Sequence, residues 1–189
     1  MLQSTESRTD RFNYSIILFT FCIRLNSLFK TLLEEGVMKK NFYIFPPILA
    51  VINFATLVPI GIIFLRTELS LCDYISITVG GILTIIFVVS LVSTHKIEQA
   101  QMKPIDVDKL ITDGPYSVVR HPNFTGIICM NIAYLFFFRT LWLIPIISVF
   151  SVLWYLEARY EEKVLIAKFG EAYRNYMKST GMFFIKLTK

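Results

Sequence analysis

Two long apolar runs limit what this chain can fold into. Residues 44–65 and 74–93 carry almost no charge and are each about as long as the roughly 20 helical residues that cross a hydrocarbon core. Of the 189 residues, 54% are hydrophobic, and a soluble core of this size does not bury so much apolar surface. We therefore expect an all-α integral membrane protein.

Two further apolar runs, residues 127–138 and 141–156, are joined by only Arg139 and Thr140. So short a joint predicts an antiparallel helical hairpin near the C-terminus. From Glu157 onward the sequence is amphipathic. The last span is expected to continue into a surface helix that stops at Gly170, with a short helix after it.

A fifth apolar run, residues 12–23, is short for a span and is followed by Arg24 and Lys30. We expect it to continue to about residue 33 and to cross the membrane with Arg24 reaching the interface, which gives about five transmembrane helices. The alternative is a helix lying in the interface.

The distribution of lysine and arginine predicts the orientation. Most of them lie in residues 34–43, 94–121 and the tail after residue 156, whereas the opposite joints hold only Arg66 and Arg139. The positive-inside rule places the three richer regions in the cytosol. Because the net charge of +5 is spread between apolar runs, we expect membrane lipids rather than nucleic acid as its partner.

These features divide the chain into two predicted parts. Residues 1–93 form the N-terminal transmembrane helices. Residues 94–189 form a core made of a cytosolic loop, the helical hairpin and C-terminal amphipathic helices. The loop and the tail share the cytosolic face, so they can form one site.

The stretch "DGPYSVVRHPNFTG", residues 113–126, is a polar segment between apolar runs. Its Asp-Gly-Pro opening is typical of a turn, and Pro122 suits the first position of a helix. It therefore brings Tyr116, Arg120 and His121 to the mouth of a span, beside a helix N-terminus whose N–H groups can bind an anion. A simpler interpretation is a cap whose arginine meets phospholipid headgroups.

Three carboxylates, Glu157, Glu161 and Glu162, follow the last apolar run. They could form a solvated face balanced by Arg159 and Lys163. However, carboxylates at a membrane mouth are costly without a cationic partner. Arg120 or a cationic ligand would supply one.

Together, "GPYSVVRHPNFTG" and "EEKVLIAKFGEAYRNY" resemble the isoprenylcysteine carboxyl methyltransferases, which are related to membrane phospholipid methyltransferases. The resemblance covers roughly residues 95–185. It implies S-adenosyl-L-methionine as methyl donor, bound on the cytosolic side, and a lipophilic acceptor such as a prenylcysteine that enters from the bilayer. Such a transfer depends on alignment more than on a base, so no catalytic residue is assigned and no metal is expected.

The resemblance also implies which residues bind the donor. Glu161 suits its ammonium, backbone N–H groups of residues 121–124 suit its carboxylate, and an aromatic ring suits its adenine or sulfonium. The predicted cofactor-binding residues are Gln101, Asp108, Lys109, Leu110, Ile111, Tyr116, His121, Pro122, Asn123, Phe124 and Glu161.

The chain departs from the family pattern at two positions. Phe124 stands where many relatives have tyrosine. Glu157 stands where we expect an arginine to hold the acceptor carboxylate; it and Arg120 are the predicted substrate-side residues. A glutamate there suits an amine or a neutral acceptor better, which keeps a phospholipid or amine N-methyltransferase open as an alternative.

A sterol-reductase-like membrane oxidoreductase with a nicotinamide cofactor is a weaker alternative. A non-enzymatic scaffold would explain the spans, but it would not explain the polar segment paired with the tail carboxylates.

Overall fold

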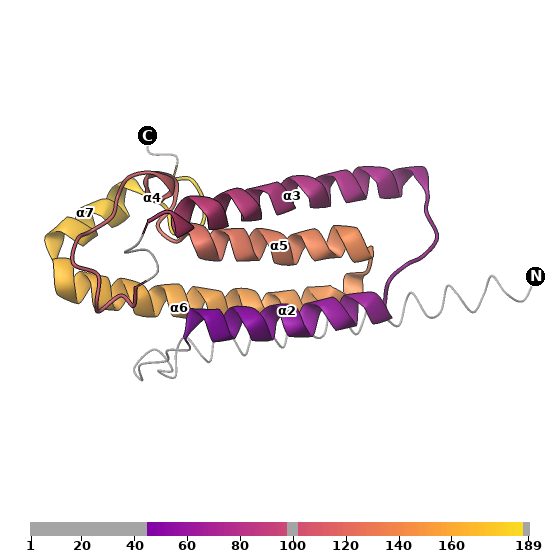
Figure 1. Cartoon of the computed structure of the whole chain (residues 1–189), viewed down its shortest axis with the longest axis horizontal. Helices are drawn as coiled ribbons and strands as arrows, with labels where there is room; N and C mark the ends of the chain where they lie inside the picture. Colours follow the sequence, from indigo (N-terminus) through magenta and orange to yellow (C-terminus); the bar gives the residue numbers. More distant parts are fainter. Residues whose placement is uncertain (1–44, 98–101, 187–189) are drawn as a thin grey trace, which may run out of the picture. The chain divides into compact units, whose positions relative to one another are not determined.

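The structure is a computed structural model that describes residues 45–97 and 102–186, and these ranges contain helices without a strand. The all-α prediction is therefore confirmed for this part of the chain. The apolar run 12–23 lies outside the described residues, so its span remains a prediction. The helices are α2 (Pro46–Ile63), α3 (Leu71–His95), α4 (Pro115–Val118), α5 (Pro122–Phe138), the 3-10 helix η2 (Leu141–Leu143), α6 (Ile144–Phe169) and α7 (Glu171–Ser179) (Figure 1).

Three of the described helical segments are long and apolar enough to cross a membrane: α2, α3 and the continuous η2–α6 segment. Helix α5 is also apolar but has only 17 residues. The chain is thus a membrane protein by these helices, and the total of five spans remains a prediction. Helix α3 begins three residues before the expected run because Asp73 accepts hydrogen bonds from the backbone and hydroxyl of Ser70, which caps its first turn.

The C-terminal hairpin is formed by α5 and α6, which lie side by side in Figure 1. Its joint is longer than the sequence suggested. Arg139 adopts a left-handed conformation with φ of 52° and η2 follows, so α6 starts at Ile144 rather than at residue 141. At the other end α6 continues to Phe169, and Gly170, with φ of 56°, ends it before α7 as predicted.

Packing between the helices combines apolar contacts with one buried polar pair. Near the start of α5, Phe124 packs with Leu49 of α2 and Trp154 of α6. Deeper in the bundle the side-chain amides of Asn53 and Asn131 exchange two hydrogen bonds of 2.7 and 2.9 Å, and both residues are fully buried. Such reciprocal bonding satisfies polar groups that a membrane interior would otherwise leave costly.

Helix α3 packs mainly on α5, and glycines bring the two together. A Cβ on Gly126 would lie 3.0 Å from the Ser90 Cβ, and one on Gly80 would lie 2.9 Å from the Phe137 ring. The opposite face of α3 exposes many large apolar side chains, including Ile75, Ile82 and Val89. That face is suited to lipid contact.

Candidate functional site

Residues 113–126 fold into a turn, a one-turn helix and a short extended segment that leads into α5. Gly114 has φ of 58°, and the Tyr116 N–H donates to the Asp113 carbonyl, which closes the predicted turn. The backbone N–H groups of Arg120 and His121 then donate to the carbonyls of Gly181 and Met182. The polar segment is therefore held by the C-terminal tail through its backbone.

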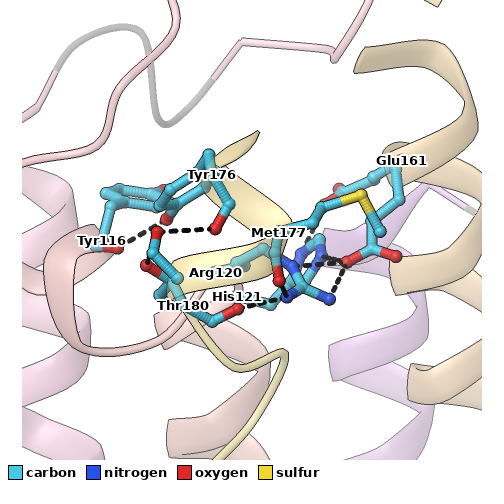
Figure 2. A network of polar contacts seen from close by, with 9 residues as sticks. Tyr116, Arg120, His121, Glu161, Tyr176, Met177 and Thr180 are labelled. Carbon is cyan, nitrogen blue, oxygen red and sulfur yellow. Dashed lines mark hydrogen bonds and ion pairs between the residues drawn. The ribbon is translucent and has the colours of Figure 1, made fainter. Parts of the chain in front are cut away.

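Arg120 joins this segment to two helices. Its Nη2 lies 2.7 Å from Glu162 Oε1, its Nε donates to the same oxygen, and its Nη1 donates to the carbonyls of Met177 and Thr180 (Figure 2). The side chains of Arg120 and Glu162 are only 9% and 3% exposed. The cation that the tail carboxylates require is thus present, and the interpretation of Arg120 as a headgroup contact is wrong.

His121 is buried between two carboxylates of α6. Its Nδ1 lies 3.1 Å from Glu161 Oε2 and its Nε2 lies 3.6 Å from Glu162 Oε1. Burial alone would lower the pKa of His121. The hydrogen bond to Glu161 and the negative charges of Glu161 and Glu162 outweigh burial and raise that pKa above its ordinary value. The ring also stacks on Phe124, with centroids 5.5 Å apart and planes 5° apart.

The three carboxylates of the tail have different surroundings. Glu157 is fully buried and Glu162 is 2% exposed, so the interpretation as a solvated face is wrong for these two. Glu161 keeps 19% of its side chain exposed and faces a cavity. Among the three, Glu161 is the carboxylate placed to meet a ligand.

A cavity of about 690 Å³, partly open to solvent, lies over the start of α5. It brings together most of the residues that the sequence predicted for the donor, from the loop, α5 and α6. Those in its wall are Leu110, Ile111, Tyr116, His121, Pro122, Asn123, Phe124 and Glu161, together with Arg120.

Three predicted residues lie elsewhere, and a fourth is not described. Asp108 and Lys109 do not line this cavity, and Glu157 lines neither of the two cavities found beside α5. Gln101 lies outside the described residues. The donor and substrate-side roles of all these residues remain predictions.

Two tyrosines of α7 complete the cavity and were not predicted. Tyr173 and Tyr176 line it, and the Tyr176 hydroxyl donates to the Tyr116 carbonyl (Figure 2). Burial raises the pKa of Tyr176 to about 12 and that of Tyr173 further, so both stay protonated donors at neutral pH. The spacing of three in "YRNY" placed both tyrosines on one face of α7, but only the fold shows what that face meets. Met102, Pro104, Val107 and Leu165 were also missed.

A second, larger cavity of about 1190 Å³ lies beside the first and is mostly apolar. It is enclosed by α2, α3, α5 and α6, with Phe54, Phe87 and Trp154 in its wall. The two cavities share Met102, Pro104, Asn123, Phe124 and Glu161. A polar ligand in the first cavity would therefore lie next to an apolar ligand in the second.

Comparison with known proteins agrees with the resemblance drawn from the motifs. The model of the isoprenylcysteine carboxyl methyltransferase (ICMT) family matches residues 74–167. This range covers most of α3, the polar segment, α5 and nearly all of α6, and it includes His121 and Glu161. No curated protein and no solved structure shows a significant match to the chain.

Proposed function

Because the chain belongs to the isoprenylcysteine carboxyl methyltransferase family, we propose that it transfers a methyl group from S-adenosylmethionine to the carboxylate of a prenylated cysteine. The family and the apolar helices make it a membrane methyltransferase of the isoprenylcysteine carboxyl type. The donor, the acceptor and the cytosolic orientation are our proposal. One observation carries it: Glu161 and His121 meet in a cavity that shares five wall residues with a larger apolar one.

The first cavity fits S-adenosylmethionine by the chemistry of its wall. Glu161 offers a carboxylate to an ammonium, and Tyr116, Phe124 and Tyr173 offer aromatic surface to an adenine or a sulfonium. Helix α5 begins in the same wall. The His121 N–H already donates to Met182 and Pro122 has none, so the N–H groups of Asn123 and Phe124 are the ones that can meet a carboxylate. When bound, the donor supplies a methyl group on a positively charged sulfur.

The residues around the cavity orient the reactants. His121 holds the Glu161 carboxylate through Nδ1, while Arg120 and His121 balance the charge of Glu162. Alignment of two reactants can lower a barrier by ~7–11 kcal/mol. No general base is required, because a carboxylate acceptor is already ionised at neutral pH.

The second cavity is the proposed place of the acceptor's hydrocarbon chain. Phe124 and Glu161 lie in the walls of both cavities, so an acceptor whose chain fills the apolar cavity has its polar end beside the donor. Glu157 lines neither cavity and is fully buried, which removes the local reason for preferring an amine acceptor. No observation on the described residues favours a second function.

A methyl-transfer assay tests the proposal. Purified protein in lipid vesicles is given S-adenosylmethionine with a labelled methyl group and either S-farnesylcysteine or phosphatidylethanolamine, and products are identified by mass. We expect the methyl ester of S-farnesylcysteine alone. Methylation of the amine lipid alone, or binding of NADPH in place of S-adenosylmethionine, would contradict the proposal.

The orientation has its own test. In Lys103→Cys and Lys178→Cys variants of a chain whose native cysteines are replaced, an impermeant thiol reagent should label both new cysteines from the cytosolic side. Labelling from opposite sides would contradict a site shared by the loop and the tail.

A further inference from the structure

The apolar cavity has a well-defined inner end. On each helix, its lining residues run from the donor cavity inward and stop at Phe54 on α2, Phe87 on α3, Ile127 on α5 and Trp154 on α6. Along α2 the lining extends over eight residues from Pro46, which is about 12 Å at the helical rise of 1.5 Å per residue. Three of the four residues at this inner end are aromatic.

The aromatic residues at this end are fixed by contacts with one another and with deeper side chains. The rings of Phe54 and Phe87 meet edge to face with centroids 6.1 Å apart. The Phe54 ring also meets the ring of Tyr134, with centroids 6.3 Å apart. Tyr134 does not line the cavity. Edge-to-face pairs of this kind hold rings in place as well as filling space.

A polar layer lies directly behind the aromatic one. The Trp154 indole N–H donates to Asn53 Oδ1 at 3.3 Å, and Asn53 is bonded in turn to Asn131. These amides satisfy each other, so a hydrocarbon chain that displaced them would leave buried polar groups without partners. Between α2, α5 and α6 the cavity cannot lengthen without such a cost, whereas Phe54 is backed by aromatic rings.

We propose that Phe54 and Phe87 form a floor that limits the length of the acceptor's hydrocarbon chain. This inference rests on the proposed function, because it takes the apolar cavity as the acceptor's site. Phe54 is the main determinant, since its ring contacts both Phe87 and Tyr134 and stands between the cavity and Tyr134. Chain length, and not the polar end of the acceptor, is what these residues select.

Binding of a graded set of chains tests the floor without requiring methyl transfer. Geranyl, farnesyl and geranylgeranyl cysteine, and the matching prenyl alcohols, compete with labelled S-farnesylcysteine for donor-free protein, in which no methyl transfer can occur. In the wild type we expect affinity to rise with chain length and then stop rising. Phe54→Ala should move this limit to a longer chain and improve the longest one severalfold relative to the wild type, whereas Phe54→Trp should move it to a shorter chain.

Phe64→Ala is the matched control, because Phe64 follows the same helix, stacks on Trp142 and lines neither cavity. It should leave the limit unchanged. Thermal unfolding in detergent identifies a variant that fails to fold, and Phe54→Leu then replaces Phe54→Ala. Two results would overturn the floor. One is a length limit that stays unchanged both in the folded small variant, Phe54→Ala or Phe54→Leu, and in Phe54→Trp. The other is a wild-type affinity that does not depend on chain length.

Together with the methyl-transfer assay, this binding experiment separates the floor from the function. If the limit shifts as expected but no cysteine carboxylate is methylated, the floor stands and the proposed reaction is wrong. If methyl esters form and the limit does not move, the reaction stands and the floor is wrong.

Discussion

The two ends of α5 each carry an arginine paired with a buried carboxylate. At the first end, Arg120 lies 2.7 Å from Glu162, and at the second, Arg139 lies 3.7 Å from Asp73. The two arginine side chains are equally buried, at 9% exposed. Both also donate to backbone carbonyls of neighbouring segments.

The two ends differ in what surrounds the ion pair. Asp73 is already bonded to Ser70, and Arg139 binds the loop before α3. At the first end a second carboxylate, Glu161, stays accessible, and His121 fixes it beside two cavities. The buried ion pair therefore stabilises the fold at both ends. The accessible carboxylate beside a cavity is what distinguishes the first end as a candidate site.

The largest expected effect concerns stability. Arg120→Ala leaves Glu162 buried without its guanidinium partner, and breaking such a pair costs about 3–5 kcal/mol. Arg139→Ala should cost less, because Asp73 retains the Ser70 hydrogen bonds. Thermal and denaturant unfolding in detergent measure both variants. As a control, the Arg120→Ala/Glu162→Ala double variant should recover part of the stability lost in Arg120→Ala. An equal loss of stability in Arg120→Ala and Arg139→Ala would contradict the difference between the two ends.

Catalysis should depend on the first end. His121→Ala removes the hydrogen bond that orients Glu161, and a bond to a charged group contributes about 1.5–3 kcal/mol. We expect kcat/KM for methyl transfer to fall roughly tenfold to hundredfold. His95→Ala, which changes the chain's other histidine, should keep wild-type kcat/KM. Comparable activity in the two variants would remove His121 from the site.

The pH dependence of stability follows from the raised pKa of His121. A group whose folded pKa exceeds its unfolded value stabilises the fold fully below the unfolded value, near 6.5, and this contribution is lost as pH rises through the folded pKa. The slope is at most about 1.4 kcal/mol per pH unit. The melting temperature of the donor-free protein should fall above this pH, and His121→Gln should flatten the profile. A parallel profile in His121→Gln would contradict the account.

The smallest effect is expected at Tyr176. Tyr176→Phe removes the hydroxyl that donates to the Tyr116 carbonyl, a bond that contributes about 1 kcal/mol, so donor affinity should fall by up to about fivefold. Tyr74→Phe is the matched control, since Tyr74 lies near the other end of the bundle and is 61% exposed. A loss of affinity in Tyr74→Phe equal to that in Tyr176→Phe would show that the effect is not local.

Local signals in the sequence were sufficient for the elements that carry the site. Proline at the start of α5, the turn at Gly114 and the stop at Gly170 depend on backbone preferences of single residues, and the structure has all three. The positions of α2 and α3 followed from their apolar runs, which are long enough to cross a hydrocarbon core. The start of α6 was misplaced because the left-handed Arg139 and its bonds to the loop before α3 depend on tertiary contacts.

The partners of the polar residues could not be read in the same way. The sequence placed Arg120 and the three glutamates at one mouth, but it did not show that Arg120 selects Glu162 or that Glu157 is fully buried. Those outcomes depend on the rotation of α6 against α5. Tyr173 and Tyr176 were missed because tertiary contacts hold α7 at the cavity: Arg120 bonds to its C-terminal end, and Tyr176 bonds to the Tyr116 carbonyl.

The most direct test of the central claim is the affinity for S-adenosylmethionine, measured by calorimetry on folded protein with one carboxylate changed at each end of α5. The account predicts that Asp73→Asn binds the donor as the wild type does. Glu161→Gln, which keeps the shape of the side chain and removes its charge, should bind it at least roughly tenfold more weakly. Wild-type affinity in Glu161→Gln, or an equal loss in both variants, would contradict the assignment of the donor site to the first end of α5.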